Sequence, residues 1–235
     1  MSEAKTYPIR CPRCRHEQAA ALYESVNVKT DPDLRQKLMA NAINVVRCGE
    51  CGLSFRVDKP LLYHDPARRI MIYLIPLADE DLSAGERQFA ELLVRLEGLL
   101  PADIRPPGIG LVFNRVELVE RIFLLEAGLN ERIIEYLKHL LYTRNAERLD
   151  PAKKALLFSA EDSNEETLCF VVQDVATRKL EAMLKYDRSV YATMAEMFDH
   201  DEQTPRLLEL FPGPRISARA LLLKELGREP ASPES

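Results

Sequence analysis

The sequence predicts an α+β protein with an N-terminal zinc ribbon that contains an inserted helix, a helical middle segment and a small αβ C-terminal part. Two observations carry this prediction. Two Cys-x-x-Cys pairs, Cys11–Cys14 and Cys48–Cys51, stand near the N-terminus in a region of strand-like alternation. The apolar spacing then becomes helical in the middle of the chain and returns in part to alternation beyond Pro151.

The composition is that of an ordinary globular protein. The chain has 235 residues, of which 46% are hydrophobic and 29% charged, so it is long enough to bury a core. Its first residues lack the apolar run of a signal peptide, and no segment approaches a membrane-spanning length. Five cysteines are too few for a disulfide-held secreted scaffold. We therefore expect a cytoplasmic protein without membrane association, whose reduced thiols favour metal over disulfides.

The N-terminal part begins with predicted strands and a short helix. Residues 7–10 read as an extended approach to the first cysteine pair, and residues 18–28 as a strand because their apolar side chains share the even positions. Asp31 is the expected N-cap of a helix with Pro32 at its first position. An apolar stripe follows on that helix: Leu34, Leu38 and Ala42.

The second cysteine pair lies between two further extended segments. Residues 43–46 lead into it, and residues 53–57 alternate as a half-buried strand. Residues 63–66 are predicted to form a turn, and the apolar residues 69–75 a covered strand. Residues 1–76 are thus the expected zinc-ribbon domain.

Residues 77–150 are predicted to be a helical segment packed on the ribbon. Ser83 and Asn114 each stand three residues before a glutamate, which is the pattern of a capping box. The helix after Asn114 is expected to stop at Gly128, and Asn130 to cap the next one. So short a link predicts an antiparallel helix pair.

The region 151–226 is predicted to be an αβ part. Three strands are expected to form a meander, at 154–160, 167–174 and 179–186, although a helix over 175–185 fits the periodicity as well. Three helices follow, at 189–198, 205–210 and 216–226. The polar residues 227–235 read as a disordered tail.

The four paired cysteines predict a zinc site. Cys11, Cys14, Cys48 and Cys51 supply four thiolates, which form a closed tetrahedral cage for Zn²⁺ and leave no position for water or substrate. Such a site is structural. A redox Cys-x-x-Cys would begin a helix, whereas a strand is expected after Cys51; the segment after Cys14 is less decided, so a redox role stays open there. An iron–sulfur cluster also accepts four thiolates. His16 offers a three-cysteine, one-histidine set, but four cysteines already complete the sphere.

The sequence predicts structural roles for the other reactive side chains. His64 and Asp65 are neighbours in the predicted turn, where a hydrogen-bonded loop histidine is favoured over a base. His139 falls on a helix flank, and His200 in an acidic run. Cys169 is expected to be a packing residue within a strand.

The charge is uneven along the chain. Residues 1–75 carry 12 basic and 8 acidic side chains, a net +4, while residues 76–150 have a net −5 and residues 151–235 a net −4. A basic N-terminal part favours nucleic acid as a partner. Four thiolates around Zn²⁺ leave about −2, however, so nearby arginines have a simpler role in offsetting the charge of the site. These are Arg10, Arg13, Arg15, Arg47 and Arg56.

Common enzyme signatures are missing from the sequence. It has no nucleophile elbow, no Walker-type loop, no dinucleotide-binding glycine pattern and no H-E-x-x-H. Aromatic residues are 7% of the chain and include no Trp, so no base-stacking surface is indicated. No catalytic residue and no small-molecule substrate are predicted.

The cysteine pattern resembles that of the CpXC domain family of bacteria and archaea. The likeness covers about the first 140 residues and departs from the family pattern where Gly49 replaces proline in the second pair. The motifs that carry it are Cys11-Pro12-Arg13-Cys14, Asn27 to Pro32, Leu62 to Asp65, Leu118 to Ile122 and Ala127 to Arg132. The resemblance implies a presumed zinc site formed by the four cysteines and no known activity.

The favoured function is therefore a non-enzymatic, zinc-stabilised interaction or regulatory protein, whose partner is another protein or a second copy of the chain. The alternatives are a nucleic-acid-binding regulator that uses the basic N-terminal part, and a thiol switch in which oxidation releases zinc. An enzyme that uses His64 and Asp65 is the last alternative.

Overall fold

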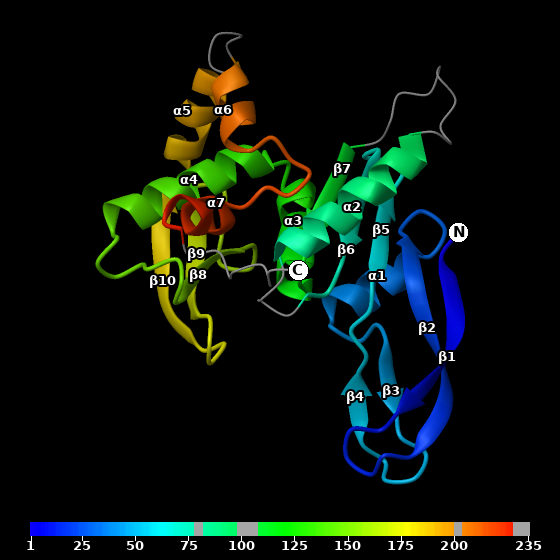
Figure 1. Cartoon of the computed structure of the whole chain (residues 1–235). Coiled ribbons are helices and arrows are strands. Elements are labelled where there is room, and N and C mark those ends of the chain that lie inside the picture. The colour runs from blue at the N-terminus through cyan, green and yellow to red at the C-terminus, as the bar shows by residue number, and fades with distance from the viewer. Residues whose placement is uncertain (78–81, 98–107, 200–203, 228–235) are drawn as a thin grey trace. The chain divides into compact units, whose positions relative to one another are not determined.

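The computed structural model describes residues 1–77, 82–97, 108–199 and 204–227 (Figure 1). The protein has a mixed α+β fold, with seven helices and three sheets in this part of the chain. It divides into two compact units, Met1–Arg115 and Val116–Ser235, which are described in turn. The predicted division into 1–76, 77–150 and 151–226 stays a prediction.

The first unit is built on a five-stranded sheet in the order β1-β2-β5-β6-β7. The pairs β1/β2 and β5/β6 are antiparallel, whereas β2/β5 and β6/β7 are parallel. The strands are β1 (Glu3–Arg10), β2 (Glu17–Asn27), β5 (Leu61–Asp65), β6 (Ile70–Leu74) and β7 (Gly108–Val112). The sheet therefore joins the N-terminal segments to a strand that follows residue 107.

Two details of this sheet differ from the sequence prediction. The turn predicted at 63–66 is wrong, because residues up to Asp65 belong to β5 and pair with β2 on one side and β6 on the other. The chain turns only after Pro66, where Arg69 takes a positive φ of 55°. The short strand β7 was not predicted; its two glycines and lack of alternation hide it from a periodicity argument.

A small antiparallel hairpin, β3 (Val45–Arg47) and β4 (Ser54–Arg56), stands beside the main sheet. Asn44, just before β3, attaches the hairpin to β2. Its buried amide accepts a hydrogen bond from Tyr23 N–H (2.7 Å) and donates one to Tyr23 C=O (3.0 Å). Side-chain bonding of this kind replaces a missing strand partner.

The predicted helix after Asp31 is present as α1 (Pro32–Met39), with Pro32 in its first turn. Asp31 is the N-cap residue, as predicted, but its side chain makes no cap hydrogen bond. Its carboxylate instead accepts from the Thr30 hydroxyl (2.6 Å) and from Ser2 N–H (3.0 Å), and these bonds lower the pKa of Asp31.

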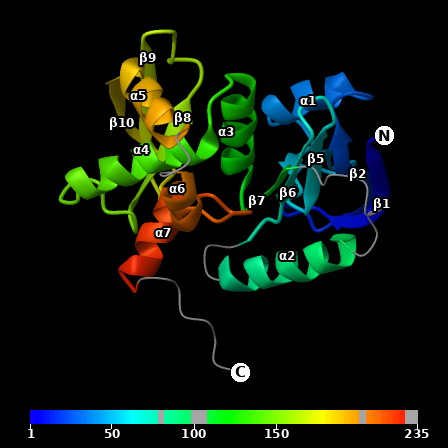
Figure 2. The same cartoon turned by 90° about the horizontal axis from the view of Figure 1, so that it is seen from above.

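The helix α2 (Leu82–Glu97) packs on the sheet on the side opposite α1 (Figure 2). Its Phe89 is fully buried and meets the ring of Tyr73 edge-on, with centroids 5.3 Å apart. Gly85 allows α2 to lie close to Phe113, since a Cβ at this position would lie only 2.7 Å from a carbon of the Phe113 ring. The predicted capping role of the Ser83 side chain lies outside the described residues.

The second unit contains the predicted meander, an antiparallel sheet in the order β10-β9-β8. The helix alternative for 175–185 is wrong, because β10 pairs along β9. The elements are α3 (Arg115–Glu126), α4 (Glu131–Arg144), β8 (Lys154–Ser159), β9 (Thr167–Asp174), β10 (Leu180–Asp187), α5 (Arg188–Asp199), α6 (Thr204–Leu210) and α7 (Ala218–Glu225). Of the predicted disordered tail, all but Gly227 lies outside the described residues.

The turn between α3 and α4 has the predicted residues, but the predicted antiparallel pair is wrong, because the two helices lie across one another (Figure 2). Gly128 takes a left-handed φ of 67° after α3, a conformation that favours glycine. Asn130 caps α4, its side chain accepting from Arg132 N–H at 3.0 Å. Both features are local, which is why the sequence reveals them.

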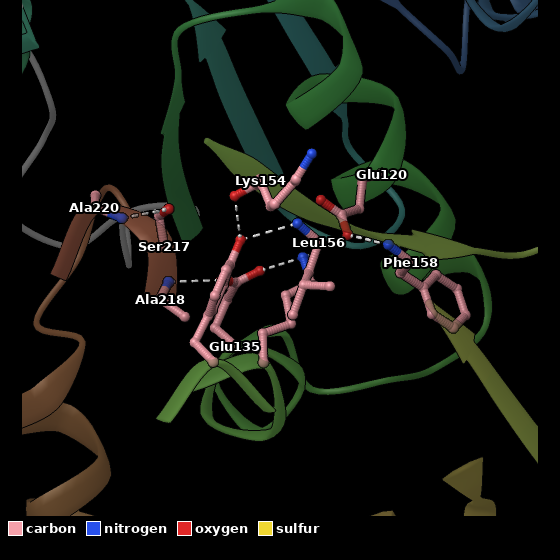
Figure 3. A network of polar contacts seen from close by, with 10 residues as sticks. Glu120, Glu135, Lys154, Leu156, Phe158, Ser217, Ala218 and Ala220 are labelled. Atoms are coloured by element: carbon pink, nitrogen blue, oxygen red, sulfur yellow. Dashed lines mark hydrogen bonds and ion pairs between the residues drawn. The ribbon is translucent and has the colours of Figure 1, made fainter. Parts of the chain in front are cut away.

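Side chains close the outer edge of β8 (Figure 3). The N–H of Leu156 donates to the Tyr142 hydroxyl (2.9 Å), which in turn donates to the carbonyl of Lys154 (3.1 Å). The N–H of Phe158 donates to a carboxylate oxygen of Glu120 (2.5 Å). Backbone groups that would pair with another strand are thus satisfied within the unit.

Glu120 also belongs to a buried charge triad with Glu135 and Lys138. The Lys138 ammonium lies 2.5 Å from a Glu120 oxygen and 2.6 Å from a Glu135 oxygen. The other Glu135 oxygen accepts from Ala218 N–H (2.7 Å), which links α4 to the start of α7. Burial by itself would lower the pKa of Lys138, but the two carboxylates outweigh it and raise that pKa.

Candidate metal centre

The two cysteine pairs occupy matching turns at the tips of two hairpins. Cys11–Cys14 joins β1 to β2 and Cys48–Cys51 joins β3 to β4, and the tips lie side by side (Figure 1). In each turn the first cysteine donates its N–H to the carbonyl five residues ahead and accepts from the N–H four residues ahead. These distances are 2.9 and 3.0 Å for Cys11 and 2.8 and 3.0 Å for Cys48.

Both turns end in a left-handed residue. Arg15 has a φ of 63° and Gly52 a φ of 69°. Such a conformation costs an ordinary L-residue about 1–2 kcal/mol, while glycine adopts it without a steric penalty. The second turn therefore has the residue that favours a left-handed conformation. In the first turn, the conformation of Arg15 is unfavourable by this amount.

Substitutions at these positions are expected to act in opposite directions. Gly52→Ala should lower the free energy of unfolding by about 1 kcal/mol, although a Cβ there meets no atom within 4 Å. Arg15→Gly should leave it unchanged or raise it by a few tenths of a kcal/mol. Gly49→Ala is the matched control, because its Cβ makes only an ordinary contact of 3.8 Å. Chemical denaturation of the three variants checks the order; equal effects at 49 and 52 would contradict it.

The four sulfurs converge on one point. Cys11 Sγ lies 3.6 Å from Cys51 Sγ, Cys14 Sγ lies 3.6 Å from Cys48 Sγ, and all four are within 4.8 Å of one another. A tetrahedral zinc with bonds of about 2.3 Å separates its sulfurs by about 3.8 Å. A disulfide would require about 2.05 Å. The donor set and its spacing therefore fit a single thiolate-bound metal ion.

Burial and hydrogen bonding differ among the four thiols. Cys11 and Cys48 are each only 1% exposed, whereas Cys14 is exposed. The backbone N–H of Cys14 lowers the pKa of Cys11 to about 6. For Cys14, the N–H of His16 lowers the pKa, but burial and the other three thiols outweigh it and raise the value to about 12. A bound divalent cation would offset the mutual repulsion of four thiolates.

Gln18 on β2 links the first hairpin to the second turn. Its amide donates to the carbonyl of Arg47 (2.9 Å) and accepts from Gly49 N–H (2.8 Å). A proline at position 49 would have no N–H and could not make the second bond. Bonds of this kind orient the ligands of a metal site. Sequence reasoning missed Gln18, since nothing local relates it to a turn 31 residues away.

The remaining predicted site residues do not join the cluster. Among the described residues, the four cysteines are the one group of His, Cys, Asp or Glu side chains close enough to share a metal ion. The side chain of His16 is exposed, and its carbonyl accepts from Cys11 N–H. The flanking arginines are exposed as well: Arg10, Arg13, Arg15, Arg47 and Arg56.

His64 and Asp65 do not form a catalytic pair. They are successive residues of β5, so their side chains point to opposite faces of the sheet. His64 Nδ1 lies 3.4 Å from the Asn27 amide nitrogen, and burial lowers the pKa of His64. Asp65 is buried and pairs with Arg68 at 2.7 Å. Both residues therefore have structural contacts.

Two other expectations concern unit 2. Cys169 is a packing residue, as predicted: it is fully buried in β9, and its thiol donates to the carbonyl of Asp162 (3.1 Å). His139 lies on α4, and its buried Nδ1 has no hydrogen-bond partner among the described residues. His200 lies outside the described residues.

Comparison with known proteins identifies the family. The family model described as "CpXC protein" matches residues 9–138, which is more than half of the chain and includes all four clustered cysteines. No curated protein and no solved structure matches the sequence. No helix among the described residues is long and apolar enough to cross a membrane. With its paired turns and converging thiols within the matched region, the chain belongs to the CpXC family.

Proposed function

We propose that Cys11, Cys14, Cys48 and Cys51 bind one Zn²⁺ and that the first unit carries a zinc ribbon with α1 inserted between its two turns. The observation that supports this most is the 3.6 Å spacing of the sulfurs across two turns with the same hydrogen bonds. Four protein ligands complete the tetrahedral sphere, so the ion has a structural role and supplies no chemistry to a substrate. A cluster of several irons would need wider sulfur spacing, which favours a single ion.

The metal is tested by elemental analysis of protein purified without added metal. One zinc per chain is expected, with little iron, nickel or copper. Cys48→Ser should reduce the zinc content to near zero, while Cys169→Ser, which removes the one cysteine outside the cluster, should leave it unchanged. An equal loss in both variants, or a metal other than zinc, would refute the proposal.

The protein's role on this proposal is a non-enzymatic interaction or regulatory one in the cytoplasm. The closed site supports it, because a metal held by four side chains organises a surface and leaves no open coordination position. The partner is another protein, and the open edge of the C-terminal sheet favours a second copy of this chain.

The edge strand β10 supports such self-association. Tyr142 and Glu120 form hydrogen bonds with backbone groups at the outer edge of β8, but no side chain among the described residues does so at the outer edge of β10. Two apolar side chains of β10 are also exposed, Leu180 by 67% and Met183 by 41%. A bulge lies at the Leu180 end, so pairing is best centred on Met183, beyond it. An antiparallel pair about Met183 places Glu181 opposite the partner's Lys185, and opposite charges across strands are favourable.

The charges of β10 allow a direct test of this arrangement. Lys185→Glu is expected to weaken the dimer about tenfold, because twofold symmetry creates the like-charge pair twice. Combining it with Glu181→Lys restores opposite charges and should recover association. Sedimentation of the wild-type and variant proteins measures both effects. A wild type that is monomeric at high concentration, or a double variant no better than the single one, rules the arrangement out.

A second candidate function is nucleic-acid binding by the first unit. The exposed arginines around the two cysteine turns favour it. The binding constant would then fall steeply with salt, as each phosphate contact releases counterions. A gel-shift assay of the wild type, Arg13→Gln and Arg47→Gln at two salt concentrations tests this function. If no complex forms, or if neither the salt nor the substitutions weaken it, nucleic-acid binding by this surface is excluded.

A further inference from the structure

An arginine of the first unit has a buried nitrogen without an acceptor. The side chain of Arg115 is only 10% exposed, and its Nη1 is buried without a hydrogen-bond partner in the part of the chain that the structure describes. Among the described residues it forms an ion pair with Asp58, whose carboxylate oxygen lies 3.3 Å from Arg115 Nε. A buried charged donor without an acceptor is costly, so proteins that retain one usually place a water or an ion beside it.

A second arginine shares the same carboxylate. Arg56 Nε lies 3.0 Å from the Asp58 oxygen that Arg115 also contacts. Arg56 Nη1 in turn donates to the side-chain amide oxygen of Asn41, Oδ1, at 2.7 Å, which holds that guanidinium in place. Two positive groups thus converge on a single negative one.

The local charge is unbalanced. Arg56, Arg115 and Asp58 together carry a net charge of +1, and both burial and the field of Arg56 lower the pKa of Arg115. Asn41 and Arg56 are exposed, whereas the side chain of Arg115 is only 10% exposed. One further negative charge would neutralise the group and supply the missing acceptor.

We propose that Arg56 and Arg115, with Asn41 holding Arg56 in place, form a binding site for an oxyanion with a single negative charge, the carboxylate of a ligand. The planar guanidinium groups suit a planar carboxylate, as their shared contact with Asp58 illustrates. The site is separate from the four cysteines and does not depend on the metal proposal. It adds a ligand-binding role to a unit for which only a structural metal is proposed.

The test uses the full-length protein and sodium acetate as the probe, with sodium chloride replacing it at equal ionic strength. Acetate at about 100 mM is expected to raise the melting temperature by about 3 °C relative to chloride, because it binds only the folded protein. Arg115→Lys keeps the positive charge but loses Nη1, and should abolish this shift. Asn41→Gly, which suits the left-handed φ of 56° at that position, should reduce it.

The control is Arg87→Gln, which alters one charge on the exposed face of α2 and should retain the full shift. Equal stabilisation by chloride and acetate would overturn the proposal, as would an undiminished shift in Arg115→Lys. Stabilisation by phosphate but not by acetate would overturn the assignment to a carboxylate. Zinc content is measured on the same samples, so a failure here is distinguishable from loss of the metal site.

Discussion

Removal of the metal is expected to unfold the cysteine turns and the β3–β4 hairpin. Each strand of this hairpin has three residues, and an isolated two-stranded hairpin is marginal in water. Metal binding at four-thiolate sites supplies about 10 kcal/mol or more of apparent folding free energy. The Asn44 and Gln18 hydrogen bonds, at about 1 kcal/mol each, cannot replace it.

Hydrogen exchange before and after treatment with a strong zinc chelator measures this effect. Amides of residues 45–56 should lose nearly all protection from exchange. Those of β8, β9 and β10 should keep theirs, because none of the four clustered cysteines belongs to that sheet. Re-addition of zinc should restore protection. A chelated protein that keeps full protection at 45–56 would show that the hairpin stands without metal.

The second large effect is expected at the buried triad of the C-terminal unit. Lys138→Met leaves Glu120 and Glu135 buried without their cation, and breaking a buried ion pair in this way costs about 3–5 kcal/mol. Lys153→Met is the matched control, since Lys153 is exposed. Urea unfolding followed by circular dichroism compares the two; similar midpoints would contradict the expected role of Lys138.

The pH dependence of this variant follows from the same burial. Burial raises the pKa of Glu120, and the charge of Glu135 raises it further. Without Lys138, the hydrogen bond from Phe158 N–H is the remaining contact that lowers it among the causes described. The folded state then binds more protons than the unfolded state between the ordinary carboxyl pKa and the raised one, so the stability of Lys138→Met should increase as the pH falls from 7 to 5. Adding Glu120→Gln and Glu135→Gln removes both charges and should abolish this trend. A Lys138→Met variant that loses stability over the same range would refute the explanation.

Local patterns were enough to locate most elements. The alternation of 154–160, 167–174 and 179–186 corresponds to β8, β9 and β10, and Asn130 caps α4 as its position before an apolar face indicates. The prediction failed at residues 63–65, where histidine and aspartate beside proline resemble a turn. There, pairing with strands on both sides outweighs local propensity, because it buries Tyr63 and satisfies the backbone.

The α+β class, most of the helices and strands, and the four cysteines in two Cys-x-x-Cys pairs follow from the sequence alone. Only the tertiary structure decided that β7 completes the first sheet, that Gln18 joins the two turns, and that Arg115 meets Arg56. Periodicity indicates which face of an element is buried, and capping and turn residues indicate where the element begins or ends. It carries no information on contacts between distant elements, such as Arg115 and Asp58, which lie 57 residues apart and meet only once the chain has folded.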